Sequence, residues 1–201
     1  MNEITLGQKI FKTNIDMNLV DRINFITDKM IEENKISSAV PYLSGKIKNV
    51  YNANNILRQA DKNKQIGKLI EQAVQKSNVD SAFDLLYIKL FSSWINEQKQ
   101  NEYQVVHQHS GSLLTGFSLI LFLKVPDFGS EFTNTILPTN GRTEIISNGG
   151  GLFGTSHYLI DPRVGDVYIF PYDMKHLVYP FKGNDIRRSL SCNFDLYLKK
   201  K

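Results

Sequence analysis

The sequence predicts an α+β fold in which an N-terminal helical part packs on the outside of a jelly roll of strands. Two observations predict it: apolar residues recur at helical spacing before residue 80, and from residue 83 onward they alternate as in strands. The length of 201 residues suits one domain, 1–201. Within it we expect helical support over 1–80 and a strand core over 83–198.

Two helices are expected in the first part. Asp16 can cap a helix with a one-sided apolar stripe. Its positions are Leu19, Val20, Ile23, Ile26 and Met30. A second pattern begins at Ile66 and runs through Leu69, Ile70, Ala73 and Val74. It should end near Ser77, and both helices should pack an apolar face on another layer.

The remaining chain predicts strands. Leu119, Leu121 and Leu123 alternate with their neighbours until Pro126 ends the run. A Pro-x-x-Gly-Asp turn at 162–166 precedes an apolar strand at 167–170, and the last strand should run from Arg187 to Tyr197. Closure of these strands into a jelly roll, also called a double-stranded β-helix, would protect their edges.

Composition limits the function classes. The net charge is +4, with basic residues scattered among acidic ones, so we expect no nucleic-acid partner. The longest apolar stretch, 117–125, is too short to span a bilayer, so no membrane partner is expected. The single cysteine, Cys192, allows no internal disulfide, and no signal segment is visible at the N-terminus. We therefore expect a cytoplasmic protein.

The histidines suggest a metal site. His107 and His109 form His-x-His, and residues two apart on a strand point to the same face. Two imidazoles could thus reach one ion, with His176 as the best candidate for a third ligand. Such pairs are more often surface or core residues, so spacing alone leaves both interpretations open. His157 matches no ligand spacing and is expected to be structural.

Longer motifs surround these histidines. The first block holds Trp94-x-Asn96, Glu102-Tyr103, His107-x-His109-x-Gly-Ser112 and Thr115-Gly-Phe117. The second holds Gly165-Asp-x-x-x-Phe-Pro171, His176 and Arg187-x-Ser-x-Ser-x-Asn193. In this order, over roughly the C-terminal half, they resemble a family of 2-oxoglutarate- and Fe(II)-dependent oxygenases found in phages and marine bacteria.

The resemblance implies a cupin-like double-stranded β-helix that uses Fe(II) as cofactor and 2-oxoglutarate as cosubstrate. The metal ligands would be His107, His109 and His176. Arg187 would grip the remote carboxylate of 2-oxoglutarate, which suits a guanidinium. Strand alternation places Ser189 on the same face as Arg187. Other candidate cosubstrate contacts are Asn96 and Tyr103.

One feature departs from the usual oxygenase site, in which a carboxylate joins two histidines. Here no acidic residue occurs between His107 and Asp127, and Ser112 stands where some relatives carry Asp. The leading hypothesis is therefore a three-histidine oxygenase, a hydroxylase. The alternatives are a cupin-like three-histidine dioxygenase that does not use 2-oxoglutarate, and a non-catalytic binding or virion-associated module.

The sequence leaves the partners open. It does not identify the substrate, although the loops between 134 and 154 are expected to shape its site. A homodimer is possible. If the chain comes from a phage, the cytoplasm would be that of the host.

Overall fold

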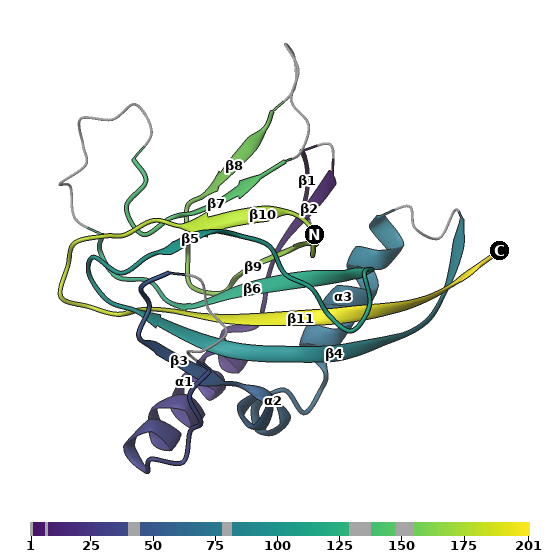
Figure 1. The fold of residues 1–201 in the computed structure, drawn as a ribbon. Helices are drawn as coiled ribbons and strands as arrows, with labels where there is room; N and C mark the ends of the chain where they lie inside the picture. Colours follow the sequence, from purple (N-terminus) through teal and green to yellow (C-terminus); the bar gives the residue numbers. More distant parts are fainter. Residues whose placement is uncertain (1, 7, 40–44, 78–81, 129–137, 148–154) are drawn as a thin grey trace.

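The structure is a computed structural model that describes all of the chain except residues 1, 7, 40–44, 78–81, 129–137 and 148–154. The loops between 134 and 154, which were expected to shape the substrate site, lie mostly outside the described residues. Two antiparallel sheets form the jelly roll, and three helices lie on the face of the larger sheet that points away from the smaller sheet (Figure 1). The predicted α+β fold with external helices is confirmed.

The larger sheet has seven strands. In spatial order they are β1 (Asn2–Leu6), β2 (Gln8–Asn14), β9 (Asp166–Pro171), β6 (Gly116–Lys124), β11 (Arg187–Lys200), β4 (Phe83–Gln98) and β3 (Asn49–Asn52). The smaller sheet has four strands: β5 (Gln104–His107), β10 (Lys175–Val178), β7 (Thr143–Ile146) and β8 (His157–Ile160). The predicted last strand begins at Arg187 as expected and extends further, to Lys200.

The helices are α1 (Met17–Glu32), α2 (Asn54–Ala60) and α3 (Gln65–Lys76). Asp16 caps α1, because its side chain accepts a hydrogen bond from the Asn18 backbone N–H at 3.0 Å. The second predicted helix is α3, and it ends before Ser77 as expected. No helix among the described residues is long and apolar enough to cross a membrane.

The alternation along β6 produces two hydrophobic cores. Leu119, Leu121 and Leu123 pack toward the helices. Ile120 and Phe122 belong to a second core that includes Ile145 of β7 and Ile160 of β8, between the sheets. β6 is thus covered on both faces and fixes the distance between the helical layer and the smaller sheet.

The N-terminal part differs from the prediction, because it also supplies strands. β2 pairs with β9, and β3 pairs with β4, so residues before 83 extend the larger sheet at both ends. The strand core is therefore wider than 83–198. β2 has seven residues, and its adjacent apolar residues Ile10 and Phe11 belong to different cores. In so short an apolar stretch, sequence periodicity does not distinguish a strand from a helix.

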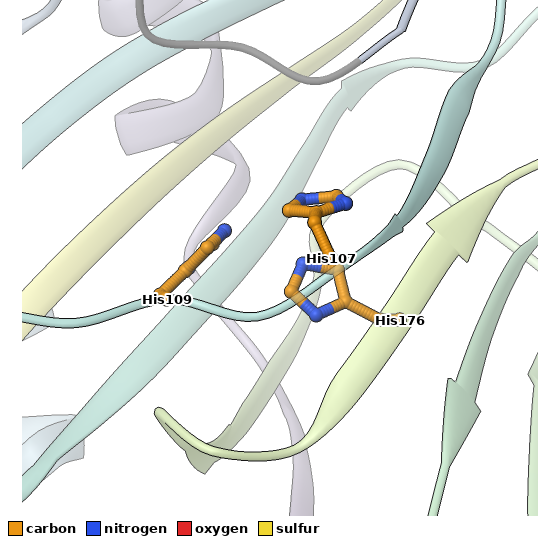
Figure 2. A group of neighbouring side chains, drawn as sticks. All are labelled: His107, His109 and His176. Carbon is orange, nitrogen blue, oxygen red and sulfur yellow. The ribbon is translucent and has the colours of Figure 1, made fainter.

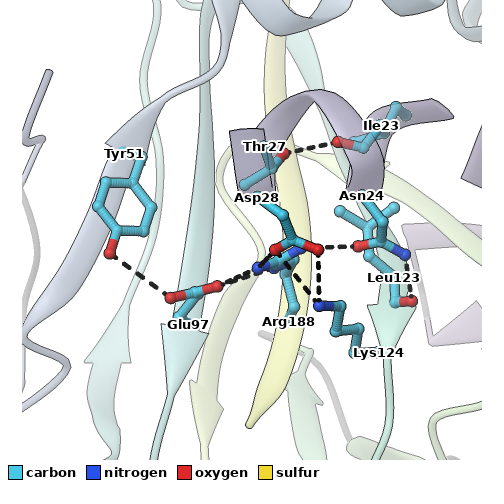
Figure 3. A network of polar contacts seen from close by, with 9 residues as sticks. All are labelled: Ile23, Asn24, Thr27, Asp28, Tyr51, Glu97, Leu123, Lys124 and Arg188. Atoms are coloured by element: carbon cyan, nitrogen blue, oxygen red, sulfur yellow. Dashed lines mark hydrogen bonds and ion pairs between the residues drawn. The ribbon is translucent and has the colours of Figure 1, made fainter. Parts of the chain in front are cut away.

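A buried ionic network joins α1 to the larger sheet (Figure 3). Arg188 of β11 is 2% exposed and forms ion pairs with Glu97 of β4 and Asp28 of α1. Its Nη1 donates to Asn24 Oδ1 at 3.0 Å, and Lys124 Nζ contacts Asp28 at 3.1 Å. Since the guanidinium is paired on each side, it serves as a structural bridge between the layers.

Cys192 lies on the same side of β11 as this network. Its thiol is free and buried in the helix-facing core, as expected for a small apolar residue. Burial, followed by the charge of Asp61, raises the pKa of the Cys192 thiol far above its usual value. The thiol therefore stays protonated.

Candidate metal centre

Three histidines meet on the inner side of the smaller sheet (Figure 2). His107 ends β5, and His176 lies directly opposite it on β10 as its cross-strand partner. His109 follows β5 and is held by a 3.0 Å hydrogen bond from its backbone N–H to Tyr172 O. One nitrogen from each ring lies within 4.8 Å of the others. The structure thus brings together all three predicted ligands.

Each imidazole is oriented by a hydrogen bond at Nδ1. His107 Nδ1 lies 2.7 Å from Val105 O, and His176 Nδ1 lies 3.1 Å from Met174 O. A backbone carbonyl can only accept, so these Nδ1 atoms carry the proton. His109 Nδ1 lies 2.9 Å from Asn193 Oδ1. In all three rings Nε2 is left as the lone-pair donor, which is how protein scaffolds orient metal-binding histidines.

The histidines favour the neutral form that binds metals. Burial, and then the proximity of His107, lowers the pKa of His109 to about 4. Burial, followed by His109 and His107, lowers the pKa of His176 well below its usual value. Burial also lowers the pKa of His107. Near neutral pH, protons therefore compete little for the three nitrogens.

Arg187 points into a small cavity beside the histidines. It is 2% exposed, and its Nη2 donates to Thr143 Oγ1 at 2.9 Å. The guanidinium lies over the Phe122 ring, 5.0 Å from its centroid. Its Nε has no hydrogen-bond partner among the described residues. Burial lowers the Arg187 pKa to about 10, so the cation persists at neutral pH, and no carboxylate of the described residues pairs with it.

Two other predicted contacts also line this cavity. Asn96 and Ser189 share it with Arg187 and the three histidines. The Asn96 Oδ1 atom is buried and without a partner in the described part of the chain. Tyr103 does not reach the cavity. Its side chain is 39% exposed because Tyr103 precedes β5, and the next residue, Gln104, lines the cavity instead.

Sequence reasoning assigned no site role to Gln104, Thr143, Ser118 or Asn193, although Asn193 ends one of its motifs. Thr143, on β7, is the hydrogen-bond partner of Arg187, and no motif marked it. Ser118 Oγ lies 2.8 Å from His109 Nδ1 and donates to Asn193 Oδ1 at 2.9 Å. Two signals were available: Ser118 interrupts the most apolar strand of the chain, and Asn193 continues the polar face of β11.

The site contains no carboxylate ligand among the residues that the structure describes. Ser112 lies elsewhere: its backbone N–H donates to Asp195 Oδ2 at 3.2 Å. Asp195 also accepts from the Tyr172 hydroxyl at 3.3 Å, so this buried carboxylate anchors the loop after His109. His157 is exposed at the start of β8, outside the cluster.

A larger cavity opens beside the histidines. Its volume is about 510 Å³, and its lining includes Phe91, Trp94, Gln108 and Asn52 together with His107 and His109. No Asp, Glu, Lys or Arg of the described ranges lines it. The Trp94 Nε1–H is buried and has no acceptor among the described residues. The cavity therefore combines apolar surface with uncharged polar side chains.

Solved structures share the fold. A prolyl-4-hydroxylase from Pseudomonas putida is 14% identical, with a TM-score of 0.56, over 92% of this chain and 91% of that chain. AviO1 from Streptomyces viridochromogenes Tue57 is 10% identical, with a TM-score of 0.62, over 92% and 88% of the two chains. A Trichoplax adhaerens prolyl hydroxylase solved with a hypoxia-inducible-factor peptide is 10% identical, with a TM-score of 0.61, over 92% and 82%.

A comparison with curated proteins finds no match. A family model described as "Putative 2OG-Fe(II) oxygenase" matches residues 92–193, half of the chain. This range contains the three histidines, Arg187 and the missed residues Ser118, Thr143 and Asn193. The chain belongs to the family of 2-oxoglutarate- and Fe(II)-dependent oxygenases.

Proposed function

We propose that the protein is a 2-oxoglutarate-dependent hydroxylase whose iron is held by His107, His109 and His176 through their Nε2 atoms. One observation carries the proposal: the cluster of three neutral imidazoles shares its cavity with a buried, unneutralised Arg187. Imidazole suits Fe(II), and the guanidinium suits a carboxylate. Fe(II), when bound with 2-oxoglutarate, would activate dioxygen as the oxidant: one oxygen atom would enter succinate as 2-oxoglutarate loses carbon dioxide, and the other would enter the hydroxylated substrate.

The chain's own residues would position the reactants. Arg187 would donate two hydrogen bonds to the remote carboxylate of 2-oxoglutarate, with Thr143 Oγ1 fixing the guanidinium. Asn193 and Ser118 would hold the His109 ring. Three neutral ligands leave the full charge of the metal to be balanced by the cosubstrate. Binding of the dianion should therefore depend on the metal more strongly than with a carboxylate ligand.

The larger cavity would accept an uncharged part of the substrate. Its lining carries no Asp, Glu, Lys or Arg among the described residues. A substrate whose reacting group bears a phosphate or carboxylate would leave that charge unpaired. Stimulation of succinate formation by anionic substrates, and by no neutral ones, would contradict this part of the proposal.

The sole tryptophan gives a direct test of metal binding. Trp94 lies 5.3 Å from the His109 ring, so Co(II) in the site should quench its fluorescence. We expect His176→Ala to weaken binding by at least about 100-fold. His157→Ala, which removes an exposed histidine outside the cluster, is the matched control and should bind as the wild type does.

The cosubstrate is tested separately. Anaerobic Fe(II) protein should develop a metal-to-ligand absorption band with 2-oxoglutarate, and Arg187→Met should abolish it at the same concentration. Succinate formation under air would then report turnover. Metal binding without this band would favour a cupin-like dioxygenase that does not use 2-oxoglutarate, whereas absence of stoichiometric metal would favour a non-catalytic module.

We also propose that the enzyme acts in the cytoplasm, that of the host if the source is a phage, on a substrate that is neither nucleic acid nor membrane. The free, buried Cys192 and the interspersed 24 basic and 20 acidic residues support this. Recovery of the native protein in a membrane or secreted fraction, or a salt-dependent shift of DNA mobility, would contradict it.

A further inference from the structure

The first half of β4 presents a strand edge to solvent. β11 pairs with β4 over its whole length, from Phe83 to Gln98. On the other edge β3 pairs only with Trp94 to Glu97. Among the described residues no strand continues β3 along Phe83–Ser93. Figure 1 shows this half of β4 leaving the sheet together with β11 as a two-stranded ribbon.

The side chains along this edge are unusually apolar for an exposed strand. Leu86 is 59% exposed, Tyr87 52% and Phe91 44%. The other exposed apolar residues of the stretch are Phe83, Leu85 and Leu90. Long apolar edge strands are avoided in soluble proteins unless another chain covers them, because their free backbone groups can extend a sheet. The edge is therefore a candidate surface for pairing with another chain.

The sequence of the edge is complementary to itself. When two copies of Phe83–Leu90 run antiparallel about an axis between Leu86 and Tyr87, Asp84 of each copy lies opposite Lys89 of the other. The same register sets Phe83 opposite Leu90 and Leu85 opposite Ile88. Opposite charges and apolar pairs directly across an antiparallel ladder are stabilising, and each pair occurs twice by symmetry.

The faces of the strand agree with this register. Asp84 and Lys89 share one face of the β4–β11 ribbon, since their partners on β11 are Lys199 and Asp195. Four apolar residues of the register share the other face: Phe83, Leu85, Ile88 and Leu90. Tyr87, opposite Tyr197, lies on the face of Asp84 and Lys89. Residues that would face one another across the axis therefore already point to the same side of the sheet.

One of the two irregularities in the β4–β11 pairing coincides with the axis, and the other lies beyond Leu90. The β4–β11 register shifts between Tyr197 and Leu198, which leaves Leu86 as the extra residue on β4. The regular runs on either side, Phe83–Leu85 and Ile88–Leu90, are the ones that would face each other between copies. Asp84 contacts Lys201 of its own chain at 3.9 Å, with both side chains more than half exposed, so this weak pair can be exchanged.

We propose that the partner is a second copy of this chain, paired antiparallel along Phe83–Leu90 to form a symmetric homodimer with one continuous sheet. Eight paired residues per copy span about 26 Å of ladder. The inference uses no residue of the metal centre, and it stands or falls independently of the oxygenase function.

Sedimentation equilibrium of the metal-free and Fe(II)-loaded protein tests the proposal. The wild type should be dimeric at protein concentrations well below about 200 µM, as expected for a specific interface of modest size. Asp84→Lys and Lys89→Asp each place like charges opposite one another twice, so each should weaken the dimer by about tenfold or more. The double variant D84K/K89D restores opposite charges and should return within about threefold of the wild type.

Two further variants complete the design. Leu86→Lys places a charge beside the axis and should weaken the dimer by about tenfold or more. Lys62→Asp changes the net charge by the same amount as Lys89→Asp, at an exposed position outside the ribbon, and should leave assembly unchanged. Circular dichroism and thermal unfolding confirm that each variant is folded. A monomeric wild type, or a dimer insensitive to both single reversals, would overturn the proposal.

Discussion

Arg187 and Arg188 are neighbours on β11 and equally buried, yet their surroundings differ. Arg188 faces the helices, where Glu97, Asp28 and Asn24 accept its hydrogen bonds. Arg187 faces the metal centre, where Thr143 Oγ1 is its one acceptor among the described residues, and its Nε is unpaired. The difference shows which buried charge is part of the scaffold and which is kept available for a ligand.

The largest expected effect is on stability and concerns Arg188, on the face of β11 that packs against the helices. Arg188→Met should lower the free energy of unfolding by about 3–5 kcal/mol, because Glu97 would stay buried without its cation. Urea unfolding monitored by circular dichroism measures it. If Arg188→Met matched the wild type in stability, the network of Figure 3 would not be a structural bridge.

The corresponding change on the other face should affect binding and not stability. Arg187→Met should weaken 2-oxoglutarate binding to the Fe(II) protein by about 100-fold, since two charge-assisted hydrogen bonds are lost. Its unfolding free energy should stay equal to that of the wild type or rise, because an unneutralised buried charge is removed. Anaerobic calorimetry and urea unfolding give the two values. A large loss of stability in this variant would remove the distinction between the arginines.

The groups on the two faces of β11 should lose their contributions to stability in different pH ranges. The pKa of His109 is lowered to about 4 in the folded metal-free protein, below its ordinary 6.5, so the unfolded chain binds the proton first. The contribution of this residue to stability is complete above pH 6.5 and decreases as the pH falls toward 4, by about 3 kcal/mol.

The helical face should respond at lower pH. Burial opposes ionisation of Asp28, but hydrogen bonding and the charge of Arg188 outweigh it and lower its pKa below 3.8. Asp28 should therefore respond below the pH range in which His109 responds.

Urea unfolding of the metal-free protein between pH 4 and 7 measures how the free energy of unfolding depends on pH in the His109 range. His109→Gln should reduce this dependence, and His157→Ala should leave it unchanged. An equal slope in both variants would contradict the assignment.

The smallest expected effect concerns the hydrogen-bond partner of Arg187. Thr143→Val keeps the shape of the side chain but removes the acceptor, so the guanidinium loses its orientation. We expect 2-oxoglutarate affinity to fall by about 1 kcal/mol, roughly fivefold, with the metal affinity unchanged. Thr115→Val, whose hydroxyl donates to Leu196 O away from the cavity, is the control and should leave the affinity unaltered.

The sequence was most informative where local periodicity and chemistry coincide. His107, His109, Asn96, Arg187 and Ser189 were predicted, and all line one cavity. Alternation along β11 correctly separated the inward Arg187 from Arg188, because the pairing of β11 with β4 is regular over that stretch.

The remaining features depend on contacts between distant segments. Thr143 contacts Arg187, 44 residues away, and Ser118 joins His109 to Asn193, which is 75 residues away. The site role of each is visible only after the sheets have formed. β2 is defined by its pairing with β9, far along the chain. Tyr103 was placed by motif order, which does not specify the residue at which β5 begins.

The burial of Cys192 has a practical consequence. Its thiol is the only one in the chain, and it is closed off from solvent and held protonated, so alkylating reagents should not reach it in the native protein. An engineered surface cysteine would then be the sole labelling position, with no need to remove a native one. Spin labels attached singly on the β4 ribbon could report distances between subunits, and dyes near the larger cavity could report substrate entry.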